Sequence, residues 1–361
     1  MNDIYNLIAE RTKQVKPISL EYKELNKNVI KLDTNENLFI NPTLINKIVK
    51  SALEDVDIRY YPPPMLEPLL EAFSRVYNVS IQQVLAGNGA DNIIEVIMRT
   101  FLNPGENIII TPPTFGVYSV AAKYYDAHIR EVPLNEDFSL NEDNILNAID
   151  NKTKIIFLCT PNNPTGNQFI TEKIIKLIEE SNKIVVLDET YADFSGQSFL
   201  KLTNQYDNLI IIRSMSKTFG AAGLRVGFCV ASERTMNIIK RMQLPFAISI
   251  VSMAVAIKLL ERYDYVKNVI KEVIQVRDFV FNELKKIEGL TPYRSDANFI
   301  LVKVERKNAN ELANSLEKRG FRVRVWKDNK HLQNFLRITL APKNVMIEFI
   351  DALNKIMSED V

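Results

Sequence analysis

Short apolar runs alternate with helical periodicity between about residue 81 and residue 230. Four of the runs are continuous and have the length of a strand: NIIIT (107–111), KIIFLC (154–159), KIVVLD (183–188) and NLIIIR (208–213). Continuous runs of this length are typical of parallel strands that are buried on both faces. Between two of them, residues 171–183 place apolar side chains on one helical face, and Thr171 is suited to cap that helix. This order predicts an α/β domain with a mostly parallel sheet between helices.

The pattern changes after Pro245. A long, charged helical pattern covers residues 257–287, and it is followed by three strand-like segments and a closing helical pattern at 297–304, 321–326, 335–340 and 343–357. These elements predict a smaller α+β unit. We expect an N-terminal arm (1–30), a large domain (31–250) and a small domain (251–361) that includes part of the N-terminal segment. The spacing of Ile4, Leu7 and Ile8 predicts a short amphipathic helix in the arm.

Composition places the chain among ordinary globular proteins. Its 361 residues are 46% apolar and 25% charged with a net charge of +1, which suits two domains and offers no basic block for nucleic acid. The N-terminus carries acids and no long apolar core, so we expect that it is not a signal peptide. The longest apolar stretch (244–260) is interrupted by Pro245 and Lys258 and is too short to span a bilayer. We expect a cytoplasmic protein with no nucleic-acid or membrane partner.

Metal and disulfide chemistry has little support in the sequence. Cys159 and Cys229 each lie in an apolar run, which favours two buried thiols over a bridge or a metal site. His128 and His331 are the only histidines and lie far apart, which argues against zinc sites and histidine-based triads.

Polar side chains follow three neighbouring strands of the expected sheet. In doubly wound α/β sheets ligands bind beyond the carboxyl ends of the strands, so these side chains are expected to meet in one crevice. They come from the loop TPNNPTG (160–166), from DETYADF (188–194) and from the end of the run 208–213: Asn163, Asp188, Tyr191, Ser214, Ser216 and Lys217.

This set matches what pyridoxal phosphate needs from a protein. The aldehyde needs a lysine, the pyridine nitrogen a carboxylate, the ring oxygen neutral donors, and the phosphate hydroxyls, an arginine and a helix N-terminus. The glycine turn GNGAD (87–91) opens such a helix, without the G-x-G-x-x-G or P-loop pattern. A ligand-binding α/β protein without catalysis remains the alternative, although it has no need of a lysine beside a pyridine-pairing aspartate.

Several motifs resemble a known family. TPNNPTG, LDETYADF and RSMSKTFGAAGLRVGF resemble the hallmark motifs of fold-type I aminotransferases. KLDTNEN, RYYPPP, GNGAD, PPTFGVY and FLRIT follow in the order and approximate spacing of the histidinol-phosphate aminotransferases, and this resemblance covers nearly the whole chain. It implies a fold-type I architecture and pyridoxal 5'-phosphate as cofactor.

The resemblance also implies roles for individual residues. Lys217 would be the Schiff-base lysine and proton shuttle, Asp188 would pair with the pyridinium nitrogen, and Tyr191 with Asn163 would bind the ring oxygen. Phe115 would stack on the ring. The phosphate would be held by Gly89, Ala90, Asp91, Ser214, Ser216 and Arg225, and by Tyr61 of the other subunit of a homodimer with shared active sites. Substrate would be bound by Asn35, Asn163, Arg324 and Arg337.

The implied activity is transfer of an amino group between glutamate/2-oxoglutarate and a small phosphorylated ketone or amine. The first choice is the pair histidinol phosphate and imidazole acetol phosphate. The chain has Pro17-Ile18 where the family commonly has Pro-Tyr. This departure keeps two alternatives open: a smaller ketone such as dihydroxyacetone phosphate, giving serinol phosphate, and a phosphoamino-acid decarboxylase on the same scaffold.

Overall fold

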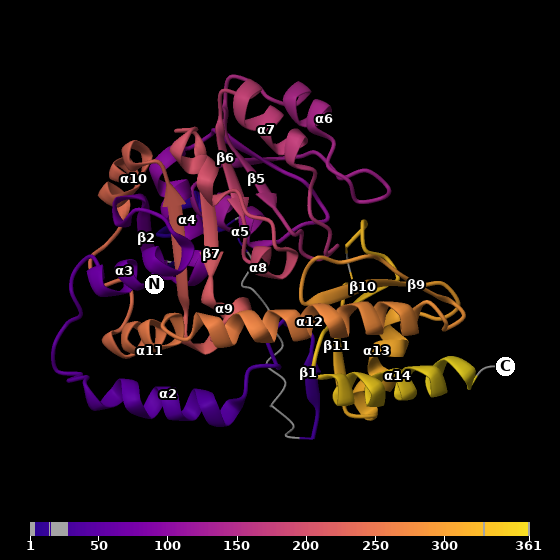
Figure 1. The fold of residues 1–361 in the computed structure, drawn as a ribbon. Coiled ribbons are helices and arrows are strands. Elements are labelled where there is room, and N and C mark those ends of the chain that lie inside the picture. Colours follow the sequence, from indigo (N-terminus) through magenta and orange to yellow (C-terminus); the bar gives the residue numbers. More distant parts are fainter. Residues whose placement is uncertain (1–3, 14, 16–27, 328, 360–361) are drawn as a thin grey trace.

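The computed structural model describes residues 4–13, 15, 28–327 and 329–359, and its larger sheet has seven strands (Figure 1). Their order is β2-β8-β7-β6-β5-β3-β4, and every adjacent pair is parallel except the two that include β8. The strands are β2 Val84–Asn88, β3 Asn107–Ile110, β4 His128–Glu131, β5 Thr153–Cys159, β6 Ile184–Asp188, β7 Leu209–Ser214 and β8 Val226–Ala231. The sequence therefore predicted β3, β5, β6 and β7 correctly, and each predicted end lies within one residue of the observed end.

The smaller sheet has five strands in the order β1-β11-β12-β10-β9. β1 joins it parallel to β11, so an early segment of the chain extends a sheet built by the last third, and the other pairs are antiparallel. The strands are β1 Ile30–Leu32, β9 Leu290–Pro292, β10 Phe299–Val304, β11 Phe321–Val325 and β12 Phe335–Thr339.

Helices cover both faces of the larger sheet. One apolar layer joins it to α4, α5 and α10, and a second, larger layer joins its other face to α3, α7, α11 and α12. The α-helices are α1 Glu10–Lys13, α2 Pro42–Glu54, α3 Glu67–Tyr77, α4 Gly89–Phe101, α5 Val117–Tyr124, α6 Glu142–Asn147, α7 Thr171–Glu180, α8 Ala192–Ser195, α9 Met215–Thr218, α10 Glu233–Ile239, α11 Ile250–Leu260, α12 Tyr263–Leu284, α13 Ala309–Lys318 and α14 Lys343–Ser358. Short 3-10 helices are η1 Ile4–Asn6, η2 Ile81–Gln83, η3 Leu200–Asn204, η4 Ala222–Leu224 and η5 Lys240–Met242.

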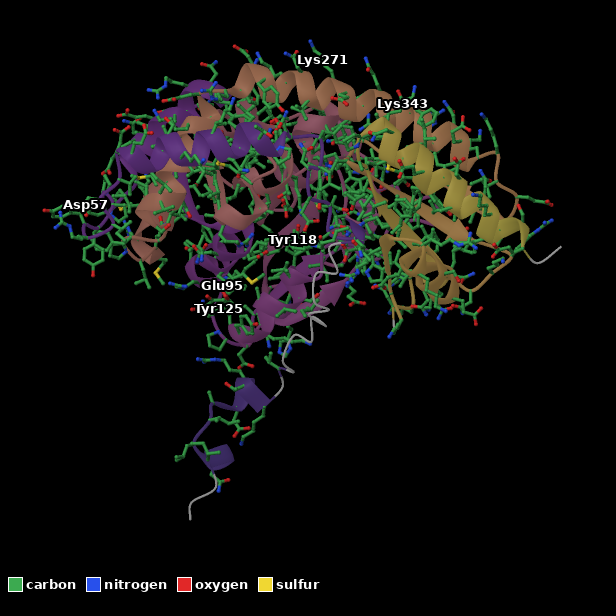
Figure 2. The ribbon with its side chains drawn as sticks, turned by 90° about the horizontal axis from the view of Figure 1, so that it is seen from below. Asp57, Glu95, Tyr118, Tyr125, Lys271 and Lys343 are labelled. Atoms are coloured by element: carbon green, nitrogen blue, oxygen red, sulfur yellow. The ribbon has the colours of Figure 1, made fainter. Side chains whose placement is uncertain are left out.

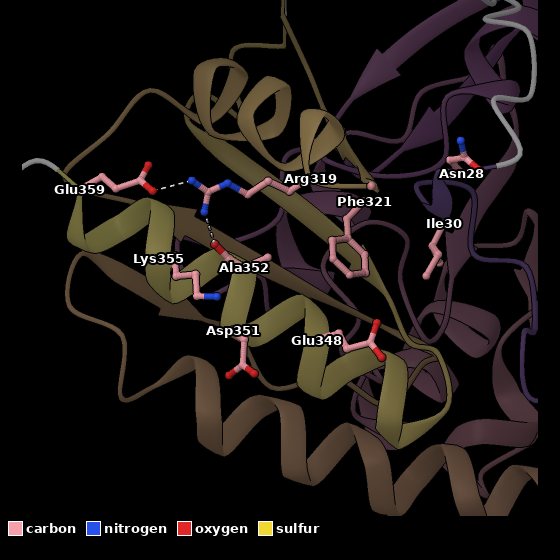
Figure 3. A pocket seen from close by; sticks show the side chains of 10 residues that line it. Asn28, Ile30, Arg319, Phe321, Glu348, Asp351, Ala352, Lys355 and Glu359 are labelled. Atoms are coloured by element: carbon pink, nitrogen blue, oxygen red, sulfur yellow. Dashed lines mark hydrogen bonds and ion pairs between the residues drawn. The ribbon is translucent and has the colours of Figure 1, made fainter.

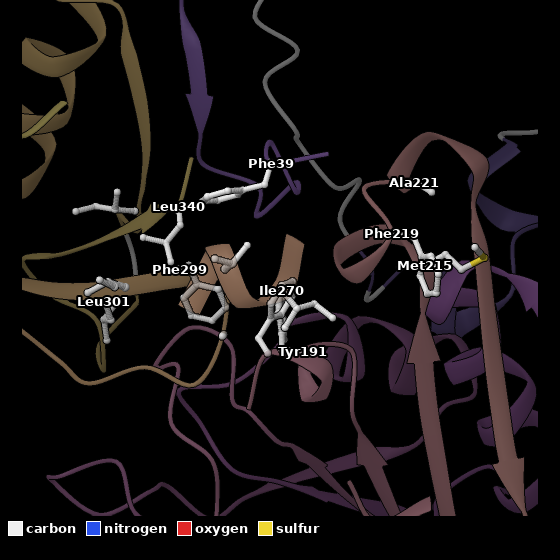
Figure 4. Close-up of a cluster of buried hydrophobic side chains, with 14 of the residues drawn as sticks. Phe39, Tyr191, Met215, Phe219, Ala221, Ile270, Phe299, Leu301 and Leu340 are labelled. Atoms are coloured by element: carbon white, nitrogen blue, oxygen red, sulfur yellow. The ribbon is translucent and has the colours of Figure 1, made fainter. Parts of the chain in front are cut away.

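The two sheets share one apolar core. A single cluster of buried side chains runs from the larger sheet through Phe39 and Ile270 to Phe299 of the smaller one (Figure 4). α12 passes along both, contacting α8 as well as β9, β10 and α14 (Figure 1). Because this helix belongs to both halves, the domain boundary near residue 250 stays a prediction. No helix in the described part of the chain combines the length and apolar character needed to cross a bilayer.

Three local expectations were wrong. The helical pattern over 257–287 is two helices, separated at Glu261 and Arg262, because α11 packs on α2 and α3 whereas α12 runs on toward the smaller sheet. No glycine or proline marks this break in the sequence.

The arm holds η1 and α1 rather than one amphipathic helix. Ile4 and Leu7 are 66% and 72% exposed, because these short pieces project from the body of the protein and have little to pack against (Figure 2).

Thr171 is the first residue of α7 and not its cap: the N-cap is Ile170, and the Thr171 hydroxyl accepts a hydrogen bond from the Gln197 side-chain amide instead.

A buried ion network ties the ends of two central strands together. The Arg213 guanidinium of β7 lies 2.7 Å from the Glu189 carboxylate and 3.0 Å from that of Asp193, and all three side chains are at most 10% exposed. Asp193 also accepts hydrogen bonds from the hydroxyls of Tyr77 and Thr218. Two carboxylates and one guanidinium thus pair with one another in a largely buried setting.

Removing the cation from this network is expected to destabilise the fold. Arg213→Met leaves two buried carboxylates without a counter-ion, which costs about 3–5 kcal/mol of unfolding free energy. The matched control is Arg234→Met, because the Arg234–Asp207 pair is 82% and 52% exposed and such pairs contribute about 0–1 kcal/mol. Thermal unfolding of both variants measures the difference. Equal losses would show that the buried network contributes no more than a surface pair.

Candidate active site

Side-chain alternation decides which residues of the central strands face the site. Asp188 and Ser214 continue the face of Val186 and Ile212, which pack toward α4 and α5. Arg213 points to the opposite face, because successive side chains of a strand alternate. The carboxyl ends of β6 and β7 therefore carry the polar site on one face and the buried ion network on the other.

A cradle forms where α4 begins. A Cβ on Gly89, which has φ +79°, would lie 2.5 Å from an Arg225 guanidinium nitrogen, and one on Gly227 would lie 2.5 Å from the Gly89 carbonyl carbon. Only glycines allow the backbone and Arg225 to approach this closely. The Asp91 carboxylate lies 2.9 Å from Arg225, and Ser214 pairs with Gly227 across β7 and β8.

The cradle has the donors that a phosphate needs. The N-cap of α4 makes no side-chain hydrogen bond, which leaves the first amides of the helix, at Gly89, Ala90 and Asp91, to face an anion. The Ser214 hydroxyl accepts from the amide of Ser216, and both serines are buried.

Lys217 lies half-buried in α9 at the centre of the charged groups. Its amine donates a 2.7 Å hydrogen bond to the carbonyl of Thr34. Burial lowers the pKa of Lys217 to about 8; the Glu36 carboxylate opposes the shift, while Arg337 and Arg225 add to it. A lysine with a lowered pKa is a neutral, nucleophilic amine at a pH where most lysines are cations.

Asp188 is 2% exposed, and both of its carboxylate oxygens accept hydrogen bonds. One carboxylate oxygen accepts from the Tyr118 hydroxyl at 2.8 Å, and the other accepts from the Thr190 amide and hydroxyl at 3.1 and 2.6 Å. Burial raises the pKa of Asp188, and these hydrogen bonds oppose that rise.

Tyr191 and Asn35 join the two sheets at the site. The Asn35 amide donates to the Tyr191 hydroxyl at 3.0 Å, and the Asn35 backbone amide donates to the Thr339 hydroxyl of β12 at 3.0 Å. Asn35 has φ 58°, a left-handed conformation that asparagine tolerates better than most residues. Burial raises the pKa of the Tyr191 phenol, so Tyr191 stays a neutral hydrogen-bonding group.

Arg337 is a buried cation with no carboxylate partner among the described residues. Its guanidinium donates to the Asn163 side-chain oxygen at 2.5 Å and to the Asp33 carbonyl at 2.6 Å, while its Nε has no partner there. It lies over the rings of Phe299 and Trp326, at 5.3 and 5.9 Å from their centroids. Burial, together with the charge of Arg324, lowers the pKa of Arg337 to about 10. A buried cation held only by neutral groups favours an anionic ligand.

The remaining expected residues lie in different settings. Phe115 packs edge-on against Tyr118, with centroids 5.6 Å apart. Arg324 is exposed, and its guanidinium lies over the ring of Trp326. In the antiparallel register of β11 and β12 it stands opposite Arg337. Tyr61 lies outside this cluster in the described chain: it is 78% exposed and stacks on Phe246 at 4.6 Å.

Sequence inspection missed several residues of the site. Tyr118 and Thr190 bond both oxygens of Asp188, and Glu36 is the carboxylate whose charge most opposes the lowered pKa of Lys217. Little in the sequence indicated these residues. Tyr118 lies three residues after Phe115 in the motif PPTFGVY, where only Phe115 was expected to have a role. Thr190 is typical of a turn.

A separate cavity of about 680 Å³ lies in the smaller unit, between α14 and β11 (Figure 3). Its wall carries both signs of charge, and Arg319 bonds Glu359 and the Ala352 carbonyl. Because its arginine is already matched, this cavity is a poor anion site. Nowhere in the described ranges do three His, Cys, Asp or Glu side chains gather as metal ligands.

The residues present fit pyridoxal phosphate. A glycine-lined cradle with two serines, an arginine and free helix amides suits a phosphate dianion, and the half-buried amine of Lys217 suits an aldehyde. Asp188, buried and acceptor-rich, suits a pyridine nitrogen. The fold and the site together define a class: pyridoxal-phosphate-dependent aminotransferases of fold type I.

Comparison with known proteins agrees with this class. The family model described as aminotransferase class I and II matches residues 27–353. A histidinol-phosphate aminotransferase of Caldanaerobacter subterraneus subsp. tengcongensis is 34% identical over 359 residues, which covers 98% of this chain and 100% of that protein. The chain belongs to the aminotransferase class I and II family and, within it, to the histidinol-phosphate aminotransferases.

Solved structures share the fold. A histidinol-phosphate aminotransferase from Clostridium acetobutylicum superposes with a TM-score of 0.84 at 24% identity, covering 91% of this chain and 99% of that one. One from Sinorhizobium meliloti, solved in complex with pyridoxal-5'-phosphate, gives 0.82 at 22% identity and covers 91% and 90%. The family model matched over residues 27–353 makes this protein an aminotransferase whose cofactor is pyridoxal 5'-phosphate.

The lowered pKa of Lys217 predicts a pH dependence in the cofactor-free protein. Capture of pyridoxal phosphate needs the neutral amine, so its rate should rise with pH and reach its midpoint near 8, rather than near the ordinary lysine value of about 10.4. Stopped-flow absorbance measures the rate. Glu36→Gln removes the carboxylate that opposes the shift and should move the midpoint lower. A midpoint near the ordinary value would contradict the account.

Proposed function

We propose that this aminotransferase acts on histidinol phosphate, with glutamate and 2-oxoglutarate as the other pair. The observation that carries this proposal is Arg337: it is buried, has no carboxylate partner in the described chain, and is held by Asn163 and the Asp33 carbonyl. A substrate carboxylate or phosphate would supply the missing charge in each half-reaction. The relatives that bear the name histidinol-phosphate aminotransferase at 34% identity support this choice over the alternatives.

The residues of the site would divide the work. Pyridoxal phosphate, when bound, supplies the carbon that carries the amino group and a ring that withdraws electrons. Lys217 would hold the aldehyde carbon and carry the proton at the substrate carbon, for which a pKa near 8 is well matched. Asp188 would keep the ring nitrogen protonated, while Asn163 and Tyr191 would bind the ring oxygen.

The anion-binding groups would then select the substrate. Arg225, Ser214, Ser216 and the first amides of α4 would hold the cofactor phosphate, and Phe115 would stack on its ring. Arg337 would bind the substrate anion. Arg324 is exposed on the neighbouring strand and would add a second positive charge at the entrance. Asn35 would fix the position of Tyr191 through their hydrogen bond.

The smaller phosphorylated ketone stays the second candidate for a specific reason. Ile18 stands where this family commonly has a tyrosine that helps to enclose the substrate. Loss of that ring would weaken recognition of the imidazole, so a short ketone phosphate would compete with it. Pro17 and Ile18 lie outside the described residues. Decarboxylation is the third candidate, since it would use the same lysine and the same aspartate.

We also propose a cytoplasmic homodimer with shared active sites. Exposed apolar side chains gather around Tyr61, which stacks on Phe246, and the tip of the same loop carries two more: Ile58 at 77% and Tyr60 at 68% exposure. Apolar surface of this kind is typical of a subunit interface. Tyr61 would reach the cofactor phosphate of the partner subunit.

Substrate identity is tested by comparing kcat/KM for histidinol phosphate and serinol phosphate as amino donors to 2-oxoglutarate. We expect a clear preference for histidinol phosphate. Arg337→Gln should lower kcat/KM by about 10- to 100-fold, the loss expected for one hydrogen bond to a charged group, and Arg324→Gln should lower it less. A preference for serinol phosphate would select the second candidate, and release of carbon dioxide from a phosphoamino acid would select the third.

Shared sites are tested by mixing two inactive variants. Tyr61→Ala damages the partner's site, and Lys217→Ala damages its own, so a mixed dimer has one site in which both residues are intact. Activity should return after subunit exchange, to at most about a quarter of the wild-type value if the subunits pair at random. Exchange is verified by mass spectrometry of tagged subunits. No recovery in verified mixed dimers would show that each site is built from one chain.

A further inference from the structure

Tyr118 is a fully buried tyrosine that the proposed mechanism does not use. It lies in the first turn of α5, where its ring stacks on Phe157 at 4.8 Å and meets the edge of Phe115 at 5.6 Å. A phenylalanine would fill the same space among these rings without burying a hydroxyl, which is costly unless the hydroxyl is hydrogen-bonded. The presence of a buried hydroxyl at this position therefore indicates that its hydrogen bond has a role.

That hydroxyl donates to Asp188 Oδ2 at 2.8 Å. The other oxygen of Asp188 accepts from the hydroxyl and amide of Thr190, so three donors from two elements hold a carboxylate that is 2% exposed. Cys159, opposite Asp188 on β5, is a buried thiol whose pKa is raised by burial, and it adds no charge. Asp91 is the acid whose negative charge raises the pKa of Asp188 further.

We propose that Tyr118 is a positioning residue: through its hydrogen bond it fixes the Asp188 carboxylate and limits how strongly that carboxylate attracts the proton it shares with the cofactor's ring nitrogen. The inference rests on the proposed role of Asp188. A donor to a carboxylate stabilises the ionised form, and here Tyr118 lowers the pKa of Asp188 against the effect of burial. Without that donor, the carboxylate becomes the stronger base, and the shared proton moves from the ring nitrogen toward Asp188.

The position of this proton is measurable without turnover. The full-length protein is loaded with pyridoxal phosphate labelled with ¹⁵N in the ring, and the nitrogen chemical shift is recorded for wild type, Tyr118→Phe and Tyr77→Phe. Tyr77→Phe is the matched control, because its hydroxyl also donates to a buried carboxylate, that of Asp193 at 3.0 Å, on the other face of the sheet. We expect the resonance to move toward the unprotonated-pyridine value in Tyr118→Phe and to stay unchanged in Tyr77→Phe.

Kinetics give a second measure on the same variant. Tyr118→Phe should lower kcat by about 10- to 100-fold, the range for one hydrogen bond to a charged group, with little change in KM. If Tyr118→Phe does not fold, Thr190→Val removes a donor from the other oxygen of the same carboxylate and should move the resonance in the same direction.

The outcomes separate this inference from the proposed site. A Tyr118→Phe resonance equal to that of wild type, or equal shifts in Tyr118→Phe and Tyr77→Phe, would overturn it while leaving the role of Asp188 intact. A wild-type ring nitrogen that is already unprotonated, or one that Asp188→Asn does not change, would overturn the assignment of Asp188 and the inference with it.

Discussion

A single buried arginine holds together the strand ends that carry the active site. Arg213 of β7 pairs with Glu189, the residue after Asp188, and with Asp193, which accepts a hydrogen bond from Thr218, the residue after Lys217. Side chains of a strand alternate, so the network fills one face of the sheet while the proposed catalytic groups occupy the other. The Asp188 carboxylate and the Lys217 amine are therefore held in place from the opposite face of the sheet by a largely buried network of charges.

Segments that are far apart in the sequence also meet at the site. Asn35, in a left-handed conformation that few residues tolerate, bonds Tyr191 of the larger unit and Thr339 of the smaller sheet. Arg337 of β12 reaches across to Asn163. Arg337 and Tyr191, which we propose bind the substrate anion and the ring oxygen, thus lie at the junction of the two sheets, where a substrate would contact both. Arg337 is buried and has no carboxylate partner among the described residues, so its guanidinium can pair with an anion that enters the site.

Much of this arrangement was predictable because strand burial leaves a strong pattern. Continuous apolar runs gave β5, β6 and β7, and the topology of parallel sheets brings the residues that follow them to one edge. Local packing choices were not predictable. Nothing in the residues at 261–262 marks the break between α11 and α12, which follows from what each helix packs on. Tyr118 lies in the motif PPTFGVY, where only Phe115 was expected to have a role, and the function of its hydroxyl follows only from the position of Asp188 at 2.8 Å.

The most direct test of the account is to find which lysine holds the cofactor. The protein contains many lysines, but among the residues that the structure describes only Lys217 lies half-buried between the proposed phosphate cradle and Arg337. Incubation with pyridoxal phosphate, reduction with borohydride and peptide mass spectrometry locate the modified residue. The account predicts one pyridoxyl group per chain, on the peptide that contains Lys217, with none in Lys217→Ala. Modification spread over surface lysines, or persisting in Lys217→Ala, would contradict it.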